Sequence, residues 1–247
     1  MKPMPERWQE LRKHCITLNP GYKYILWNES QVDALINEHY SWILPTIKSY
    51  PYKIMKNDAV RYFLLYHFGG IYFDLDMECR MPFDLLIKNV SYDTETNKDG
   101  AKDVILGGTP PVGITNSFII SKKNDNFVKS LMESLPSSSR WYILPYWTIM
   151  MSTGPFYVWK VYRSYRCQDH VHVMNYNLLN SRFLNHKHAG SWHTWDGWIT
   201  SFCGKNITLI VPIILNMILL IIFKSLVRKY RKSRTSEQYQ KSEISIL

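Results

Sequence analysis

The chain has 247 residues, of which 46% are apolar, 15% are aromatic and 20% are charged. This composition excludes a disordered or fibrous protein and is sufficient for one large globular domain. The formal net charge is +10, but residues 224–247 alone carry seven basic and two acidic groups, hence +5. The remaining +5 suits a phosphate-bearing ligand or an anionic membrane surface, and it does not indicate nucleic acid as a partner.

The first third of the chain is predicted to alternate between helices and strands. Apolar residues recur at helical spacing, and Gly69-Gly70 supplies a helix stop. Ser30 is predicted as an N-cap with Asp33 at the N3 position. The expected elements are a helix around residues 8–15, a strand at 22–27, a helix from 30 to 39, a helix at 53–68 and a strand at 71–74.

Beyond a polar loop at 91–103, the alternation continues. Residues 104–106 and 118–120 read as buried strands, and 127–135 as the apolar face of a helix. Alternating helices and strands are typical of an α/β fold. The sequence therefore predicts one α/β domain over residues 1–205.

The C-terminal part predicts a membrane segment. Residues 207–223 form a run of seventeen without a charge, at the lower end of what can cross a bilayer as a helix. A buried core helix is the alternative, but Pro212, Asn216 and the basic residues that follow favour a transmembrane helix at 206–223. The basic tail at 224–247 is then expected in the cytosol, with the domain in the lumen.

Three Asn-x-Ser/Thr sequons, at Asn28, Asn89 and Asn206, are compatible with a lumenal domain. Residues 1–15 contain no apolar core of signal-peptide length. Either an N-terminal anchor is missing from this chain, or the chain inserts by its tail and the topology is inverted.

The four cysteines, Cys15, Cys79, Cys167 and Cys203, are far apart and include no Cys-x-x-Cys pair. This spacing argues against a zinc site. Disulfides in an oxidising compartment and buried free thiols are both open interpretations.

Two carboxylates, Asp74 and Asp76, bracket one apolar residue at the end of a predicted strand. If Phe73 and Leu75 point into the core, period-two alternation aims both carboxylates at the opposite side. There they can bind Mg²⁺ or Mn²⁺, which would neutralise charge on a nucleotide leaving group. Paired surface acids are the alternative explanation of this motif.

The helix before this motif carries Asp58 and Arg61, three positions apart and therefore on one face. Arg61 is suited to a bidentate hold on a phosphate or to pinning a carboxylate. A purely structural ion pair is the alternative. The informative feature is the joined order of Asp-x-x-Arg, Gly-Gly, aromatic residue and Asp-x-Asp.

The stretch at 141–162 carries eight aromatic residues in twenty-two. One interpretation is a membrane-facing surface that positions the head group of a lipid acceptor. The other is ordinary core packing.

The segment NDAVRYFLLYHFGGIYFDLDMECRMPFDLL, residues 57–86, resembles the Asp-x-Asp glycosyltransferases. That family includes the fungal initiating α-1,6-mannosyltransferase and, with closer similarity, the catalytic subunits of inositol phosphoceramide mannosyltransferase. The likeness extends from PERWQELRKHC through PVGITNSFIISKK, and again at Ser191-Trp192-His193, so it covers most of the predicted domain.

The resemblance implies a GT-A type fold, a divalent cation, usually Mn²⁺, and transfer with retention of anomeric configuration. It also implies roles for individual residues. Asp74 and Asp76 would be catalytic metal ligands, with Asp74 also contacting the donor. His193 would be a third metal ligand or phosphate contact. The implied donor-binding residues are Asp58, Arg61, Tyr72, Asp74 and Trp192.

One departure from the family is expected to matter. Its members usually begin with a strand of the type Ile-Pro-Lys-x-Ile-His-Gln, which lies against the donor base and follows a membrane anchor. That strand is absent from this sequence, so the GT-A domain is expected to lack its first strand, which places full activity in doubt.

The leading functional hypothesis is a metal-dependent transferase that moves mannose from GDP-mannose to inositol phosphoceramide in Golgi or ER membranes, together with a regulatory membrane subunit. One alternative acceptor is a protein-linked glycan, and one alternative role is that of a truncated non-catalytic paralogue that binds a catalytic partner. An aspartyl-phosphate hydrolase is disfavoured, because Glu78 stands where such enzymes carry Thr or Val.

Overall fold

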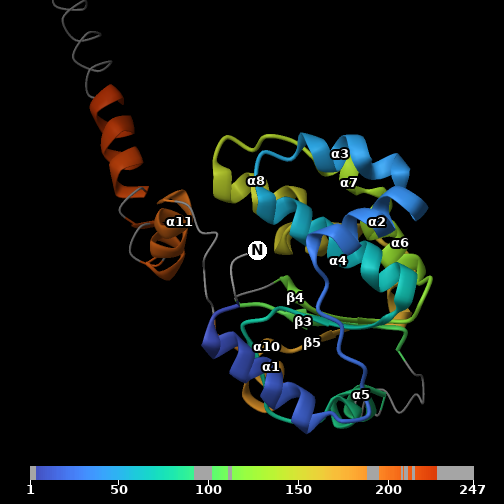
Figure 1. Cartoon of the computed structure of the whole chain (residues 1–247). Helices are drawn as coiled ribbons and strands as arrows, with labels where there is room; N and C mark the ends of the chain where they lie inside the picture. Colours follow the sequence, from blue (N-terminus) through green and yellow to red (C-terminus); the bar gives the residue numbers. More distant parts are fainter. Residues whose placement is uncertain are drawn as a thin grey trace, which may run out of the picture. The chain divides into compact units, whose positions relative to one another are not determined.

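The computed structural model describes residues 4–91, 102–110, 113–187, 195–206, 208, 211–212 and 215–226. The chain divides into two compact units, Met1–His193 and Thr194–Leu247. The first unit holds the sheets and most of the helices (Figure 1). The second holds the helix α11 (Trp195–Lys205) and further helical residues at 215–226.

The first unit is built around a mixed four-stranded sheet with the order β1-β4-β3-β5. Strand β4 pairs antiparallel with β1 and with β3, whereas β3 and β5 are parallel. The strands are β1 (Gly70–Phe73), β3 (Val104–Gly108), β4 (Ile114–Ser121) and β5 (Val171–Met174). Helices cover this sheet, so the structure confirms the predicted α/β class.

The sheet separates two apolar cores. Side chains alternate across a strand, so Val104 and Leu106 of β3 enter one core and Ile105 enters the other. The two helical layers lie on opposite sides of the sheet in Figure 1. On the side of Val104 and Leu106 are α2 (Glu29–His39), η1 (Ser41–Ile43), α3 (Leu44–Ser49), α4 (Lys53–Phe68), α6 (Asn126–Glu133), α7 (Leu135–Ser138), α8 (Pro145–Ser152) and α9 (Pro155–Ser164).

The layer on the side of Ile105 is smaller and includes a second, two-stranded sheet. Strands β2 (Met77–Cys79) and β6 (Leu184–His186) pair antiparallel, with Met77 opposite His186. The helical elements in this part of the chain are α1 (Glu6–Leu18), α5 (Phe83–Ser91), α10 (Tyr176–Leu178) and the π-helical turn η3 (Leu179–Phe183), while the 3-10 turn η2 (Gln168–His170) precedes β5.

Helix α4 confirms the predicted bounds Lys53–Phe68, and the residue after it shows why the helix stops there. Gly69 has a φ of 68°, in the left-handed region that a residue without Cβ adopts at little cost. A Cβ at this position would also lie 2.6 Å from the backbone nitrogen of Lys123. The chain can therefore turn directly from α4 into β1.

Two local predictions are wrong. Helix α2 is capped by Asn28 rather than Ser30, because the Asn28 side chain accepts from the Gln31 amide (2.9 Å) while the Gln31 side chain accepts from the Asn28 amide (3.0 Å). Residues 22–27 form no strand. Within the described part of the chain no strand lies beside them, and side chains such as Tyr24, whose ring is 6.3 Å from that of Phe73, provide their contacts instead.

In the second unit, the expected transmembrane helix at 206–223 is not supported. Among the residues that the structure describes, no helix has the length and apolar character that crossing a membrane requires. Positions 207, 209, 210, 213 and 214 of the expected span lie outside the described residues, as does the basic tail from 227 onward.

Candidate functional site

Helix α4 contributes a buried ion pair to the candidate site. Arg61 Nη2 donates to Asp58 Oδ1 at 2.7 Å, which confirms that the two side chains share a face. Asn116 Nδ2 donates to the same oxygen (2.9 Å), and Thr153 Oγ1 donates to Oδ2 (3.1 Å). Desolvation raises the pKa of Asp58 to about 6, against the opposing effect of the Arg61 charge. The ion pair with Arg61 and the two further donors oppose this desolvation and stabilise the ionised carboxylate.

Arg61 also connects this pair to the first carboxylate of the Asp-x-Asp motif. Its Nη1 donates to the Asn116 carbonyl (2.6 Å) and lies 3.3 Å from Asp74 Oδ1. Tyr72 donates its hydroxyl proton to the same Asp74 oxygen at 2.9 Å, and its ring lies under the guanidinium, 4.7 Å from Arg61 Cζ. Arg61 Nε is buried and has no hydrogen-bond partner among the residues that the structure describes. Arg61 and Tyr72 thus fix the position of Asp74.

The two carboxylates are brought together by a turn and not by strand alternation. Strand β1 ends at Phe73, and the Met77 amide donates to the Asp74 carbonyl at 3.1 Å to close the turn. Leu75, predicted to point into the core, is 36% exposed. The prediction that Asp74 and Asp76 lie close together is therefore confirmed, but the reason given for it is wrong.

A histidine that the sequence analysis did not single out completes this cluster. His186 ends β6, and its Nε2 lies 3.2 Å from Asp76 Oδ1. One potential ligand atom from each of Asp74, Asp76 and His186 lies within 4.8 Å of the others. Two carboxylate oxygens and one imidazole nitrogen are a donor set that fits Mn²⁺ or Mg²⁺.

The pairing of β2 with β6 explains how His186 reaches this place. Met77 lies opposite His186 in the ladder, and the Lys187 amide donates to the Asp76 carbonyl at 3.0 Å. Burial disfavours the charged imidazolium, but the hydrogen bond to Asp76 and the negative charges of Asp76 and Asp74 outweigh it. The pKa of His186 is raised as a result. The predicted site residues Trp192 and His193 lie outside the described residues.

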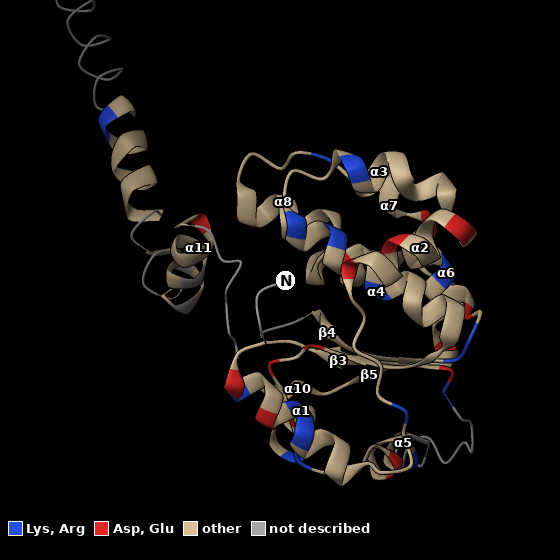
Figure 2. Cartoon of the chain, in the orientation of Figure 1, with Lys and Arg blue, Asp and Glu red and all other residues tan. Residues whose placement is uncertain are grey.

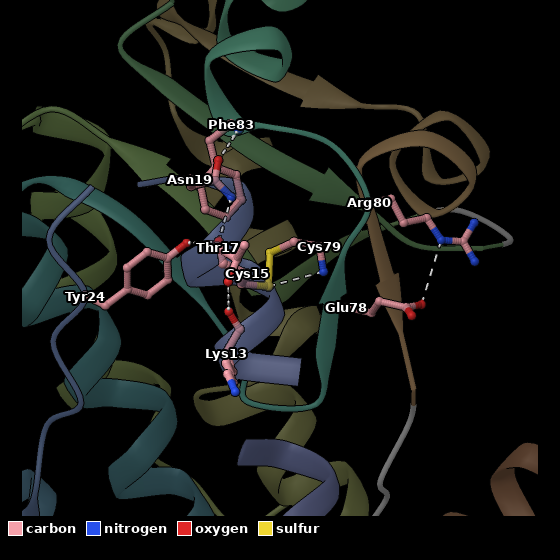
Figure 3. The surroundings of a disulfide bond; sticks show 9 residues. All are labelled: Lys13, Cys15, Thr17, Asn19, Tyr24, Glu78, Cys79, Arg80 and Phe83. Carbon is pink, nitrogen blue, oxygen red and sulfur yellow. Dashed lines mark hydrogen bonds and ion pairs between the residues drawn. A yellow bond between two sulfur atoms is a disulfide. The ribbon is translucent and has the colours of Figure 1, made fainter. Parts of the chain in front are cut away.

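A disulfide bond ties the same strand to the N-terminal helix. Cys15 of α1 and Cys79 of β2 are bonded across 64 positions of sequence, which resolves the open question about these two cysteines (Figure 3). Asn19, one helical turn further along, accepts from the Phe83 amide at 2.6 Å. Helix α1 therefore fixes the chain just beyond the Asp-x-Asp turn, and through β2 it also supports His186. Cys167 is free and exposed.

A cavity of about 510 Å³ adjoins the site. It lies between residues 22–27 on one side and α4 and β1 on the other. Arg61 and Tyr72 contribute to its lining, whereas Asp74 and Asp76 do not. Most of its lining is apolar, including Trp27 and Phe68. On this side β1 is the edge strand of the described sheet. The absence of a first GT-A strand stays a prediction.

Comparison with known proteins shows which family this arrangement resembles. Residues 5–93, which contain Asp58, Arg61 and the Asp-x-Asp turn, match the family described as "Glycosyltransferase sugar-binding region containing DXD motif". The resemblance to the Asp-x-Asp glycosyltransferases inferred from the sequence is therefore confirmed over these residues.

Curated relatives narrow the resemblance further. The chain is 31% identical over 219 residues to Inositol phosphoceramide mannosyltransferase 2 of Schizosaccharomyces pombe, covering 84% of this chain and 60% of the relative. It is 35% identical over 202 residues to Mannosyl phosphorylinositol ceramide synthase CSH1 of Saccharomyces cerevisiae, covering 78% and 50%. The chain thus spans between half and three fifths of the length of these relatives.

Among solved structures, the PaToxG Glycosyltransferase superposes with a TM-score of 0.44 and 16% identity, over 66% of this chain and 64% of that one. A likeness this distant carries no argument about this chain.

Proposed function

We propose that this chain is the donor-binding and catalytic part of a metal-dependent retaining GT-A type glycosyltransferase, which moves mannose from GDP-mannose to inositol phosphoceramide in sphingolipid synthesis. The observation that carries the proposal is the cluster of Asp74, Asp76 and His186 beside the buried Asp58–Arg61 pair. The mannosyltransferase and inositol phosphoceramide activities named for the relatives support the sugar and the acceptor. The matched sugar-binding region supports the type of reaction.

In this proposal Asp74, Asp76 and His186 hold a divalent cation, Mn²⁺ or Mg²⁺. Such a cation, when bound, neutralises the negative charge that develops on the nucleotide diphosphate as the sugar departs. Asp74 is oriented by hydrogen bonds from Tyr72 and Arg61, so its carboxylate is set before any ligand arrives. Trp192 and His193 are proposed, on the resemblance alone, to contact the donor and the cation.

Arg61 and Tyr72 are proposed to serve the donor directly as well. Both line the 510 Å³ cavity, so each has one side on Asp74 and another on space that a ligand can enter. The residues that the structure describes leave Arg61 Nε without a hydrogen-bond partner, and a phosphate or sugar oxygen would satisfy this buried donor once the guanidinium turns toward the cavity. Asp58 does not line this cavity, so in this proposal it acts by holding Arg61 in place.

The disulfide supports a location in an oxidising compartment. Structural disulfides persist in secreted proteins and in the lumen of the secretory pathway, and they are rare in the cytosol. The Cys15–Cys79 bond lies in the interior, and both residues are fully buried. We therefore propose a lumenal location for the domain, in the Golgi or ER at a membrane that supplies the lipid acceptor. A regulatory membrane subunit is proposed on the resemblance alone.

The test is transfer of labelled mannose from GDP-mannose to inositol phosphoceramide by membranes carrying this chain, with and without Mn²⁺. The Asp74→Ala/Asp76→Ala double variant is expected to lose transfer. A Glu133→Ala variant on the surface of α6 is the matched control for removing an acid, and it should retain transfer. Protein-linked glycans are offered as a competing acceptor. Mannose appearing on the glycan only, or unchanged transfer by the double variant, contradicts the proposal.

A further inference from the structure

The loop between α7 and α8, residues 139–144, presents large apolar side chains to solvent. Ile143 is 82% exposed and Trp141 is 59% exposed. Among the other exposed large apolar side chains that the structure describes in the first unit, none exceeds 51%. Single exposed apolar residues are common on protein surfaces, but two of the most exposed at one loop tip indicate an interaction surface. We call residues 139–144 the apolar tip.

The backbone of the apolar tip directs Ile143 outward. Ile143 has a φ of 67°, a conformation that is unfavourable for a β-branched residue. Hydrogen bonds hold the loop in this form: the Tyr142 amide donates to Thr148 Oγ1 (3.0 Å), and the Thr148 hydroxyl donates to the Leu144 carbonyl (2.8 Å). The exposed position of Ile143 is therefore built into the loop.

The rest of the 141–162 stretch behaves differently. Thr148, Ile149, Tyr157, Val158 and Val161 of α8 and α9 are buried, so the core-packing interpretation holds for these residues. Trp147, Phe156 and Trp159 of the same stretch are half-buried, so the apolar tip is its most exposed part.

The surroundings of the apolar tip are basic. Residues 134–168 contain no Asp or Glu and include Arg140, Lys160, Arg163 and Arg166. Residues 39–57, which form η1, α3 and the start of α4 in the same helical layer, also lack acidic residues and carry Lys48. Lys53 and Lys56 in the same range pair with Glu29 and Asp33 of α2, so their charges are neutralised. Figure 2 shows basic positions and no acidic ones on α3 and on the loop before α8. An apolar centre within a cationic surface is complementary to anionic lipid headgroups over an apolar interior.

We propose that the apolar tip inserts into the surface of a bilayer that carries anionic lipid headgroups, with Trp141 and Ile143 entering the boundary between headgroups and acyl chains. Helix α8 starts directly after the tip, and Thr153 at its end donates to Asp58. Eight helical residues span about 12 Å. Docking would therefore hold the site close to the bilayer surface. A site held there could reach a lipid acceptor in the bilayer. This consequence rests on the proposed function, whereas the docking itself does not.

The test uses the full chain reconstituted in vesicles, with one environment-sensitive fluorophore on Ile143→Cys in a Cys167→Ser/Cys203→Ser background. A label at Leu85→Cys on α5 is the control, because Leu85 is also exposed, at 41%, and α5 lies at the opposite end of the unit in Figure 1. Vesicles of phosphatidylcholine with phosphatidylinositol are compared with phosphatidylcholine alone, and aqueous iodide reports whether each label is in water.

The label at 143 is expected to lose its iodide quenching in the phosphatidylinositol vesicles, whereas the label at 85 keeps it. Adding Trp141→Ser should restore part of the quenching at 143. Equal quenching of both labels in both vesicle types overturns the docking proposal. Protection of the label at 143 by a second, unlabelled copy of the chain, but not by vesicles, overturns it as well. Transfer is assayed separately. Protection without transfer supports docking and counts against the proposed function, whereas transfer without protection counts against docking alone.

Discussion

The site has two halves that differ in burial and in what holds them. In the inner half, the Asp58 and Arg61 side chains are 7% and 4% exposed, and neighbours from three elements bind them. In the outer half, the Asp76 and His186 side chains are 12% and 25% exposed, and they lie on or beside a two-stranded sheet that a disulfide ties to α1. The comparison suggests a division of labour, in which the inner half sets geometry and the outer half stays accessible to a ligand.

The largest expected effect comes from replacing Arg61, the positively charged side chain at the centre of the inner half. Arg61→Met leaves two carboxylates, Asp58 and Asp74, without their partner, and breaking a buried pair in this way costs about 3–5 kcal/mol. Urea unfolding followed by circular dichroism measures the change. Arg166→Met removes an exposed arginine and should change the free energy of unfolding by no more than about 0.5 kcal/mol. Equal effects of the two substitutions would show that the inner half is not a structural scaffold.

Removing the disulfide is expected to destabilise the outer half of the site more than the inner half. Cys15→Ser/Cys79→Ser is expected to lower the free energy of unfolding by about 2–4 kcal/mol. Hydrogen exchange should show the loss of protection concentrated in β2 and β6, with α4 less affected, because the bond joins α1 to β2. Equal loss of protection in α4 and in the β2–β6 pair would contradict the view that the disulfide supports the outer half.

A smaller effect, on binding and not on stability, is expected at His186. Replacing this partly exposed residue by Ala should weaken Mn²⁺ binding about 10–100-fold, the range seen when a supporting or ligating contact of a metal site is lost. Isothermal titration calorimetry measures the affinity, and thermal unfolding should be nearly unchanged. His14→Ala, on the exposed side of α1, is the matched control. Full Mn²⁺ affinity in the His186 variant would remove it from the cation site.

The smallest effect is expected from Thr153→Val, which keeps the side-chain shape and deletes the hydroxyl that donates to Asp58. Asp58 keeps its bonds from Arg61 and Asn116, so the loss should be about 1–2 kcal/mol. Urea unfolding measures it. A loss as large as that of Arg61→Met would indicate that Asp58 depends on Thr153 more than on the arginine.

The same contrast explains what the sequence could predict. The inner half depends on local spacing: Asp58 and Arg61 are three residues apart on a helix whose period and glycine stop are readable, so their contact was predictable. The outer half depends on pairing between strands 110 positions apart, which brings His186 to Asp76. No local pattern distinguishes that histidine from the other seven. The strand predicted at 22–27 failed for a similar reason, since a local sequence can favour an extended chain but does not provide a neighbouring strand.

The central claim is that the turn after β1, together with β6, binds a divalent cation. Electron paramagnetic resonance of free Mn²⁺, titrated with the full chain in the presence of GDP, tests it most directly and does not depend on the acceptor. We expect saturable loss of the free Mn²⁺ signal, corresponding to one site per chain, and no such loss with the Asp74→Asn/Asp76→Asn variant. Equal retention of Mn²⁺ by both proteins, or by neither, would contradict the claim.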